Sequence, residues 1–79
     1  MATDEGQENG PGPGERLRRA REAMGRSPED ISEELRLSAD QVRSLEAEAF
    51  HQLPGEAYIR GYLRNYAAAV GIPPEEIMA

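Results

Sequence analysis

Apolar residues recur along this chain at the three- and four-residue spacings that are typical of amphipathic helices. The first such stretch begins at Glu15, and Gly25 supplies the residue type that commonly ends a helix. Its inward face is made by residues three or four apart, namely Leu17, Ala20, Met24 and the aliphatic stem of Arg21. The spacing therefore predicts a first helix that starts at Glu15 and buries this face.

Two helix-start signals follow close together. Ser27 is a good N-cap residue, and Pro28 stands at the first helical position, where its missing N–H costs nothing. Ser38 is a second N-cap, and Gln41 three residues later completes a capping box. The residues that face inward from the two predicted helices are Ile31, Leu35, Val42 and Leu45. Two short helices joined by a tight link after Arg36 predict a helix-turn-helix.

A longer fourth helix is predicted from about Gly55 to Val70, after an irregular connector over residues 50–54. At about 100° per residue, its core-facing residues are Ile59, Leu63, Tyr66 and Val70. Gly71 ends this helix, and residues 73–78 predict a short fifth helix whose Ile77 packs back on the rest. The predicted fold is all-α, a five-helix bundle that contains a helix-turn-helix.

The fourth helix carries aromatic and basic residues outside its core face. Tyr58 and Tyr62 lie one turn apart on an adjoining stripe, and Arg60 and Arg64 lie on the opposite flank. Tyr and Arg dominate interface hot spots, because each combines a large contact area with a polar end. Two interpretations are open: the pair is a contact patch for another protein, or it seals the rim of the core.

The helix-turn-helix itself suggests DNA binding through Ser38, Gln41 and Arg43 on the third helix. The charge argues against it. Residues 27–51 hold seven acidic residues against two arginines, and the sequence pI is about 4.7. Affinity for DNA comes mainly from Lys and Arg at phosphates, so we do not expect a nucleic-acid partner. A DNA-binding transcriptional regulator that uses the third helix is kept as the alternative function.

Composition excludes most enzymes and metalloproteins. With 79 residues there is room for one domain, and the chain has no cysteine and a single histidine, His51. Zinc sites need three or four ligands, and His51 has no Ser or Cys nucleophile at a recognisable spacing. We therefore expect no catalytic residue, no metal, no cofactor and no small-molecule substrate.

The ends of the chain set the expected domain boundaries and location. Residues 1–14 are acidic and rich in Gly and Pro, which predicts a disordered tail ahead of a domain over residues 15–78. No apolar run approaches the roughly 20 residues that span a bilayer, and the first residues lack the features of a secretory signal. These features indicate a cytoplasmic domain.

The predicted first helix is rich in arginine, with Arg16, Arg18, Arg19 and Arg21. Such a cluster could meet an acidic partner or anionic lipid head groups. The simpler interpretation is a solvated face whose charge is offset by Glu15 and Glu22.

Two blocks of sequence carry a resemblance. The run from Gly14 to Glu22, and the block from Tyr58 to Ala67 with Pro-Glu-Glu a few residues beyond Val70, resemble the cytoplasmic N-terminal domain of the RodZ family of bacterial cell-shape proteins. The resemblance covers residues 14 to about 78. The block around Tyr62 is specific to the family, whereas the helix-turn-helix alone is shared with many repressor-like regulators.

The resemblance implies that the five-helix bundle is repressor-like, and that it is a non-enzymatic adaptor that binds the actin-like filament protein MreB and links it to the cell-wall elongation machinery. It implies that the aromatic pair of the fourth helix, here Tyr58 and Tyr62, touches the filament protein, with Arg60 and Arg64 at the rim. Family members often have Phe at the first aromatic position, so Tyr58 adds a hydroxyl. Repressor-like DNA binders often place Gln where this chain has Pro28, which weakens the DNA interpretation.

The resemblance also implies that the chain is part of a longer protein, held in the inner membrane by a single span downstream of Ala79. The only membrane contact expected is through that segment. A further alternative is a dimerisation module whose fourth helix packs on itself.

Overall fold

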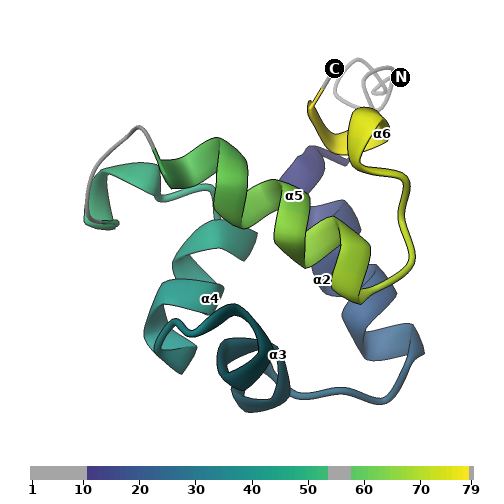
Figure 1. The fold of residues 1–79 in the computed structure, drawn as a ribbon, viewed down its shortest axis with the longest axis horizontal. Coiled ribbons are helices and arrows are strands. Elements are labelled where there is room, and N and C mark those ends of the chain that lie inside the picture. The colour runs from purple at the N-terminus through teal and green to yellow at the C-terminus, as the bar shows by residue number, and fades with distance from the viewer. Residues whose placement is uncertain (1–10, 54–57, 79) are drawn as a thin grey trace, which may run out of the picture.

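The computed structural model describes residues 11–53 and 58–78 of the chain. Its elements are α2 (Pro13–Ala23), α3 (Pro28–Leu35), α4 (Ala39–Glu46), the 3-10 helix η1 (Phe50–Gln52), α5 (Ile59–Ala69) and α6 (Pro74–Met78). In that part of the chain there are five α-helices and no strand, which confirms the all-α fold. In Figure 1, α5 crosses the middle of the bundle, with α3 and α4 below it and α2 behind it.

Helices α3 and α4 form the predicted helix-turn-helix, and both are capped by their own sequence. Ser27 accepts a hydrogen bond from the Asp30 amide, and the Asp30 carboxylate accepts one from the Ser27 amide. Ser38 and Gln41 make the same reciprocal pair at the start of α4. Each capping box satisfies amides that would otherwise lack partners at a helix start.

Four helices end in the same way. In each, one residue adopts the left-handed conformation, and the amide of the next residue bonds to a carbonyl five positions back. This arrangement is the Schellman motif. The left-handed residues are Gly25, Arg36, Glu48 and Gly71, so the stops predicted at both glycines are confirmed.

The core gathers where α5 crosses the other helices. Its fully buried side chains include Tyr66 of α5, together with Leu17, Ile31, Val42 and Leu45. Leu63, Val70 and Ile77 are also buried, and Ala20, Leu35 and Ile59 pack against this cluster while partly exposed. Helix α5 packs on α3 and α6, and α2 packs on α4.

Three sequence expectations differ from the structure. Met24 is 53% exposed, because α2 ends at Ala23 and none of the described helices covers the turn that follows. Helix α2 begins at Pro13 and not at Glu15, since proline fits the first helical position and the buried Gly14 packs against α4. The connector expected to be irregular forms η1 over Phe50–Gln52.

The remaining boundary expectations lie partly outside the described residues. The tail expected over residues 1–14 is described only from Pro11, and the predicted start of the fourth helix near Gly55 falls in a gap. The described α5 begins at Ile59. Across residues 11–53 and 58–78, no helix has both the length and the apolar character needed to cross a membrane.

Candidate functional site

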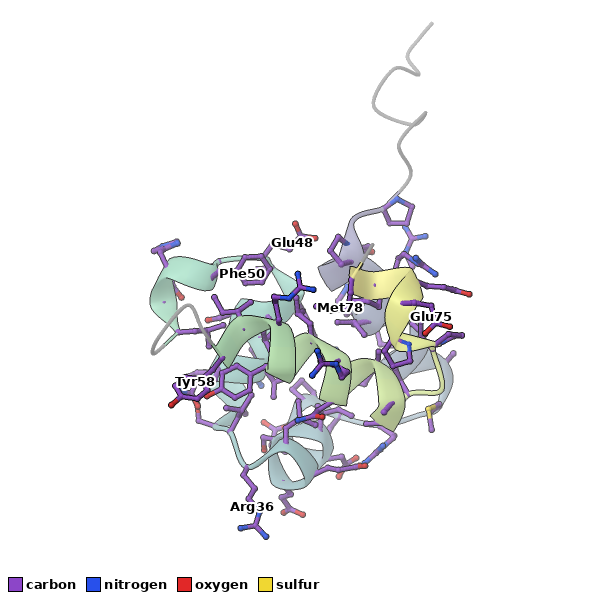
Figure 2. The ribbon with its side chains drawn as sticks, turned by 45° about the horizontal axis from the view of Figure 1, so that its top comes forward. Arg36, Glu48, Phe50, Tyr58, Glu75 and Met78 are labelled. Atoms are coloured by element: carbon purple, nitrogen blue, oxygen red, sulfur yellow. The ribbon has the colours of Figure 1, made fainter. Side chains whose placement is uncertain are left out.

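The aromatic pair of α5 is divided between the core rim and the solvent. Tyr58 stands at the N-cap of α5 and is 63% exposed, whereas Tyr62 is half-buried and packs against the core. Their ring centroids lie 6.3 Å apart with the planes tilted by 33°. Figure 2 shows Tyr58 at the beginning of α5, on the surface of the bundle. Tyr62 therefore anchors the pair, and Tyr58 presents a large apolar ring to the outside.

The rest of the outer face of α5 is basic and lined with small residues. Arg60 and Arg64 are exposed and lie about 120–160° round an ideal helix from the tyrosines. Between the two flanks runs a crest made by Gly61 and Ala68. Leaving aside its two chain neighbours and the backbone of its own helix, a Cβ atom added at Gly61 would meet no atom of the described residues within 4 Å. We call the residues Tyr58, Arg60, Gly61, Tyr62 and Arg64 together the α5 surface.

Most arginines of the chain are already engaged. Within the described residues, six of the nine arginines form ion pairs: Arg16, Arg18, Arg19, Arg21, Arg26 and Arg43. In the same part of the chain the other three, Arg36, Arg60 and Arg64, pair with no carboxylate. Two of these three lie on the α5 surface, so the cationic charge left for another molecule is concentrated there.

The arginines of α2 are all paired with acids, partly with Glu15 and Glu22 of the same helix, as the simpler interpretation expected, and partly with acids of other helices. Arg18 and Arg19 both bond to Glu15, and this contact lowers the pKa of the Glu15 carboxyl to about 2. Arg18 also reaches Glu22, at 2.8 Å, and Arg16 reaches the Glu76 side chain on α6, also at 2.8 Å. Exposed pairs of this kind contribute little to stability, but they leave α2 with little charge to offer a lipid surface.

A buried charged cluster that joins α2, α4 and α5 holds α5 in place. The Arg21 Nε of α2 donates to a carboxylate oxygen of Glu46 on α4 at 2.8 Å, and the Tyr66 hydroxyl of α5 donates to the same oxygen. Burial and the Glu46 charge raise the pKa of Tyr66, and the bond to Glu46 raises the pKa of Arg21. We call these three residues the buried cluster. It ties three helices together, so α5 presents its outer face from a fixed position.

A second polar tie fixes the far end of α5. The Arg26 guanidinium donates to the Ala69 carbonyl at 3.2 Å and to the Glu34 carboxylate at 2.7 Å. The C-terminal end of a helix carries a partial negative charge, which stabilises a cation at this position.

The residues considered for DNA contact are occupied within the protein. Ser38 and Gln41 cap α4 through each other's backbone. Arg43 pairs with Asp40 at 3.2 Å and with Glu29 at 3.1 Å. Arg43 would have to leave two carboxylates before it could meet a phosphate, which lowers the electrostatic gain from DNA binding.

Comparison with known proteins identifies the family. The family model described as "Helix-turn-helix domain" matches residues 16–77, and the chain belongs to that family. A solved structure of YmfM from Staphylococcus aureus, described as a candidate DNA-binding membrane protein, is 28% identical to this chain. The two structures superpose with a TM-score of 0.80, over 85% of this chain and 82% of that chain.

Proposed function

We propose that this helix-turn-helix domain is a non-enzymatic docking module whose partner is the actin-like filament protein MreB. In the full-length protein, a membrane segment downstream would tether the filament to the inner membrane and its elongation machinery. The observation that carries the proposal is the exposed ring of Tyr58, which lies beside the ring of Tyr62 on a helix that packs into the core. The resemblance to the RodZ family, which implies that an aromatic pair at these two positions contacts the partner, supports the proposal.

The charge of the α5 surface supports protein docking more than DNA binding. Arg60 and Arg64 have no ion-pair partner among the described residues. Arg43 of α4, the helix that would contact DNA, is paired with two acids. Unpaired rim charges orient a partner and raise the rate of association. A partner with acidic groups around an apolar groove fits this surface.

Gly61 gives an independent reason to expect close contact. A glycine inside a helix costs about 1 kcal/mol relative to alanine, and the space around Gly61 would accept a methyl group. Packing within the described part of the fold therefore does not explain why this position is glycine and not alanine. A partner whose backbone comes close to the crest of α5 would supply one.

The proposal is tested by co-sedimentation of the chain with purified MreB filaments. Tyr58→Ala should abolish or strongly reduce co-sedimentation and leave the melting temperature almost unchanged, because the ring is exposed. Met24→Ala is the matched control, since Met24 is the other large apolar side chain exposed in the described residues. Undiminished co-sedimentation of Tyr58→Ala, or an equal loss for Met24→Ala, would contradict the proposal.

DNA binding is the second candidate, because the family is defined by a helix-turn-helix and YmfM is described as a candidate DNA-binding protein. It would use Ser38, Gln41 and Arg43. Titration with mixed duplex DNA at low salt separates the two functions: micromolar or tighter binding with a steep salt dependence would favour the DNA function. We expect weak binding, because of the acidic residues around α4.

A further inference from the structure

Two of the four left-handed helix ends carry residues that resist this conformation. The left-handed region is unfavourable for residues with a Cβ atom and is occupied mainly by glycine. This chain uses glycine at positions 25 and 71, but it has Arg36 with φ 61° and Glu48 with φ 59°. Such outliers call for a reason, which lies either inside the fold or in a binding function.

Glu48 has an internal reason. Its carboxylate accepts a hydrogen bond of 3.0 Å from the Gly14 amide, at the start of α2. The side chain thereby satisfies an unpaired amide of a neighbouring helix. Glycine at position 48 would remove this contact.

Arg36 has no such reason in the described part of the chain. Its side chain is exposed and takes part in none of the ion pairs or side-chain hydrogen bonds among residues 11–53 and 58–78. Figure 2 shows it projecting from the end of α3, away from the body of the molecule. The unfavourable backbone conformation at Arg36 is thus not offset by a contact within this part of the fold.

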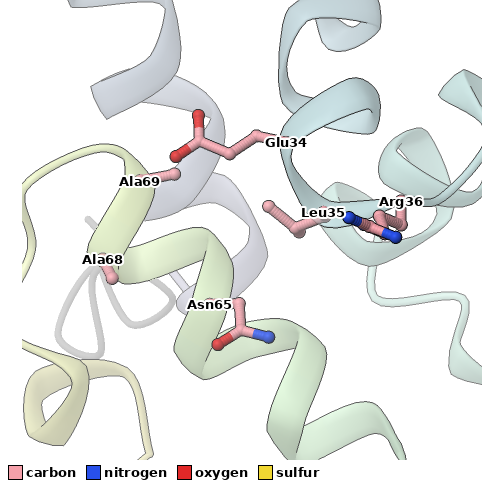
Figure 3. A pocket seen from close by; sticks show the side chains of 6 residues that line it. All are labelled: Glu34, Leu35, Arg36, Asn65, Ala68 and Ala69. Carbon is pink, nitrogen blue, oxygen red and sulfur yellow. The ribbon is translucent and has the colours of Figure 1, made fainter.

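Arg36 borders a groove between the end of α3 and the outer side of α5. The groove has a volume of about 460 Å³ and is lined by Glu34, Leu35, Arg36, Asn65, Ala68 and Ala69. Figure 3 shows Glu34 and Leu35 of α3, with Arg36 just past its end, on one side of the groove and the three α5 residues on the other. Its apolar lining is Leu35 on the α3 side and the short side chains of Ala68 and Ala69 on the α5 side. Its acidic residue, Glu34, is paired with Arg26. Among residues 11–53 and 58–78, Arg36 is therefore the charged residue of the groove that forms no ion pair.

The groove continues the α5 surface. On an ideal helix, Tyr58, Tyr62, Asn65 and Ala69 fall within about 60° of one another. This stripe leads from the aromatic pair, at the start of α5, to the groove at its end. One partner that covers Tyr58 and Tyr62 can therefore reach Arg36 without crossing the basic flank.

We propose that this groove is the second half of the docking surface, and that it receives an apolar side chain flanked by a carboxylate, which pairs with Arg36. The inference rests on the proposed function, because the same partner covers both halves. A carboxylate is the group that matches the planar guanidinium through two hydrogen bonds. The short side chains of Ala68 and Ala69 leave room for the apolar neighbour of that carboxylate.

Arg36→Gly tests this inference without weakening the fold. Glycine is the preferred residue in the left-handed position, so the melting temperature should stay the same or rise. Affinity for MreB filaments, measured by co-sedimentation over a range of filament concentrations, should fall about five- to thirtyfold, as for an interface hot spot. The remaining affinity should depend less on salt concentration. Arg19→Gln, which removes one exposed charge from α2, is the control and should bind like the unchanged protein.

A second variant tests the groove itself. Ala68→Gln fills the groove with a longer side chain that helices tolerate well, and it should also reduce the affinity. If Arg36→Gly and Ala68→Gln bind normally while Tyr58→Ala does not, the groove inference is wrong and the docking function stands. If Tyr58→Ala binds normally, the docking function fails, and with it the shared surface on which this inference rests.

Discussion

The buried cluster allows a sharp test of what holds α5 in place. Glu46→Gln keeps the size and shape of the side chain but removes its negative charge. The carboxylate accepts bonds from Arg21 at 2.8 Å and 3.2 Å and a further bond from the Tyr66 hydroxyl. The glutamine side chain replaces one of the two acceptor oxygens with an NH2 group, which is a donor. This NH2 group must face either the guanidinium or the phenol, and both of these are donors themselves.

The size of the effect follows from burial. The side chains of Arg21 and Glu46 are 8% and 7% exposed, so the substitution leaves a buried cation without its hydrogen-bonded, buried anion. Breaking a buried ion pair in this way costs about 3–5 kcal/mol. Arg21 keeps its bond to the Arg26 carbonyl, so the lower end of that range applies. A chain of this length has about 4–12 kcal/mol of stability in total, so the variant loses a large share of it.

The measurement is thermal and urea unfolding, followed by far-UV circular dichroism at neutral pH. A loss of about 3 kcal/mol should lower the melting temperature by about 12 °C or more. Glu22→Gln is the matched control, because Glu22 also approaches Arg21, at 3.8 Å, but is 52% exposed. Its expected effect is below about 1 kcal/mol. If Glu46→Gln melts within a few degrees of the unchanged protein, the charged pair does not stabilise the fold as argued here.

Three further predictions concern stability alone. Gly14→Ala should destabilise by about 1–3 kcal/mol in urea unfolding, because its Cβ would lie 2.7 Å from the Leu45 carbonyl oxygen; a melting temperature equal to that of the unchanged protein would contradict this. Ser27→Ala should cost about 1 kcal/mol in the same measurement, through loss of the cap on α3, and an effect within error would show that the cap is dispensable. The pKa of Glu15 is lowered from 4.5 to about 2, so its contribution is complete above pH 4.5 and is lost as the pH falls through 2. The melting temperature should therefore fall over this acid range, and it should fall less steeply for Glu15→Gln. If the two proteins lose melting temperature equally as the pH falls, Glu15 is not the source of the acid sensitivity.

The regular parts of this fold could be predicted because their signals are local. A capping serine followed three residues later by Asp30 or Gln41 satisfies amides within one turn, whatever the rest of the chain does. The apolar spacing then identifies the buried face of each helix. Met24 is the exception: it has the right spacing, but burial also requires a neighbouring helix, and none lies over the end of α2.

The buried cluster could not be predicted in full, because it depends on how three helices meet. A partial signal was present. Arg21 lies four residues after the buried Leu17, and Glu46 lies four residues after the buried Val42, so both charges share a face with the core. Spacing shows that the two charged side chains point inward, but not that they meet each other and Tyr66. That contact is a property of the packing of α2 against α4.

For the candidate site, too, helical spacing predicts the face on which a residue lies but not its contacts. The position of Tyr58 and Tyr62 beside the core face follows from helical geometry, but the difference in their exposure does not. Arg36 was not predicted at all, because a left-handed arginine leaves no mark in the pattern of apolar residues. Only the backbone conformation shows that the residue at this helix end is an unfavourable choice.

Two residues of this chain are not the residue types that would make their helices most stable. Gly61 stands inside a helix where alanine would be better, and Arg36 stands at a helix end where glycine would be better. Both border the outer side of α5, and neither has a compensating contact in the described residues. If binding is the reason for both, a chain that carries Gly61→Ala and Arg36→Gly should melt at a higher temperature than the unchanged protein and yet co-sediment poorly with MreB filaments. A double variant that is more stable and binds equally well would show that neither residue is kept for docking.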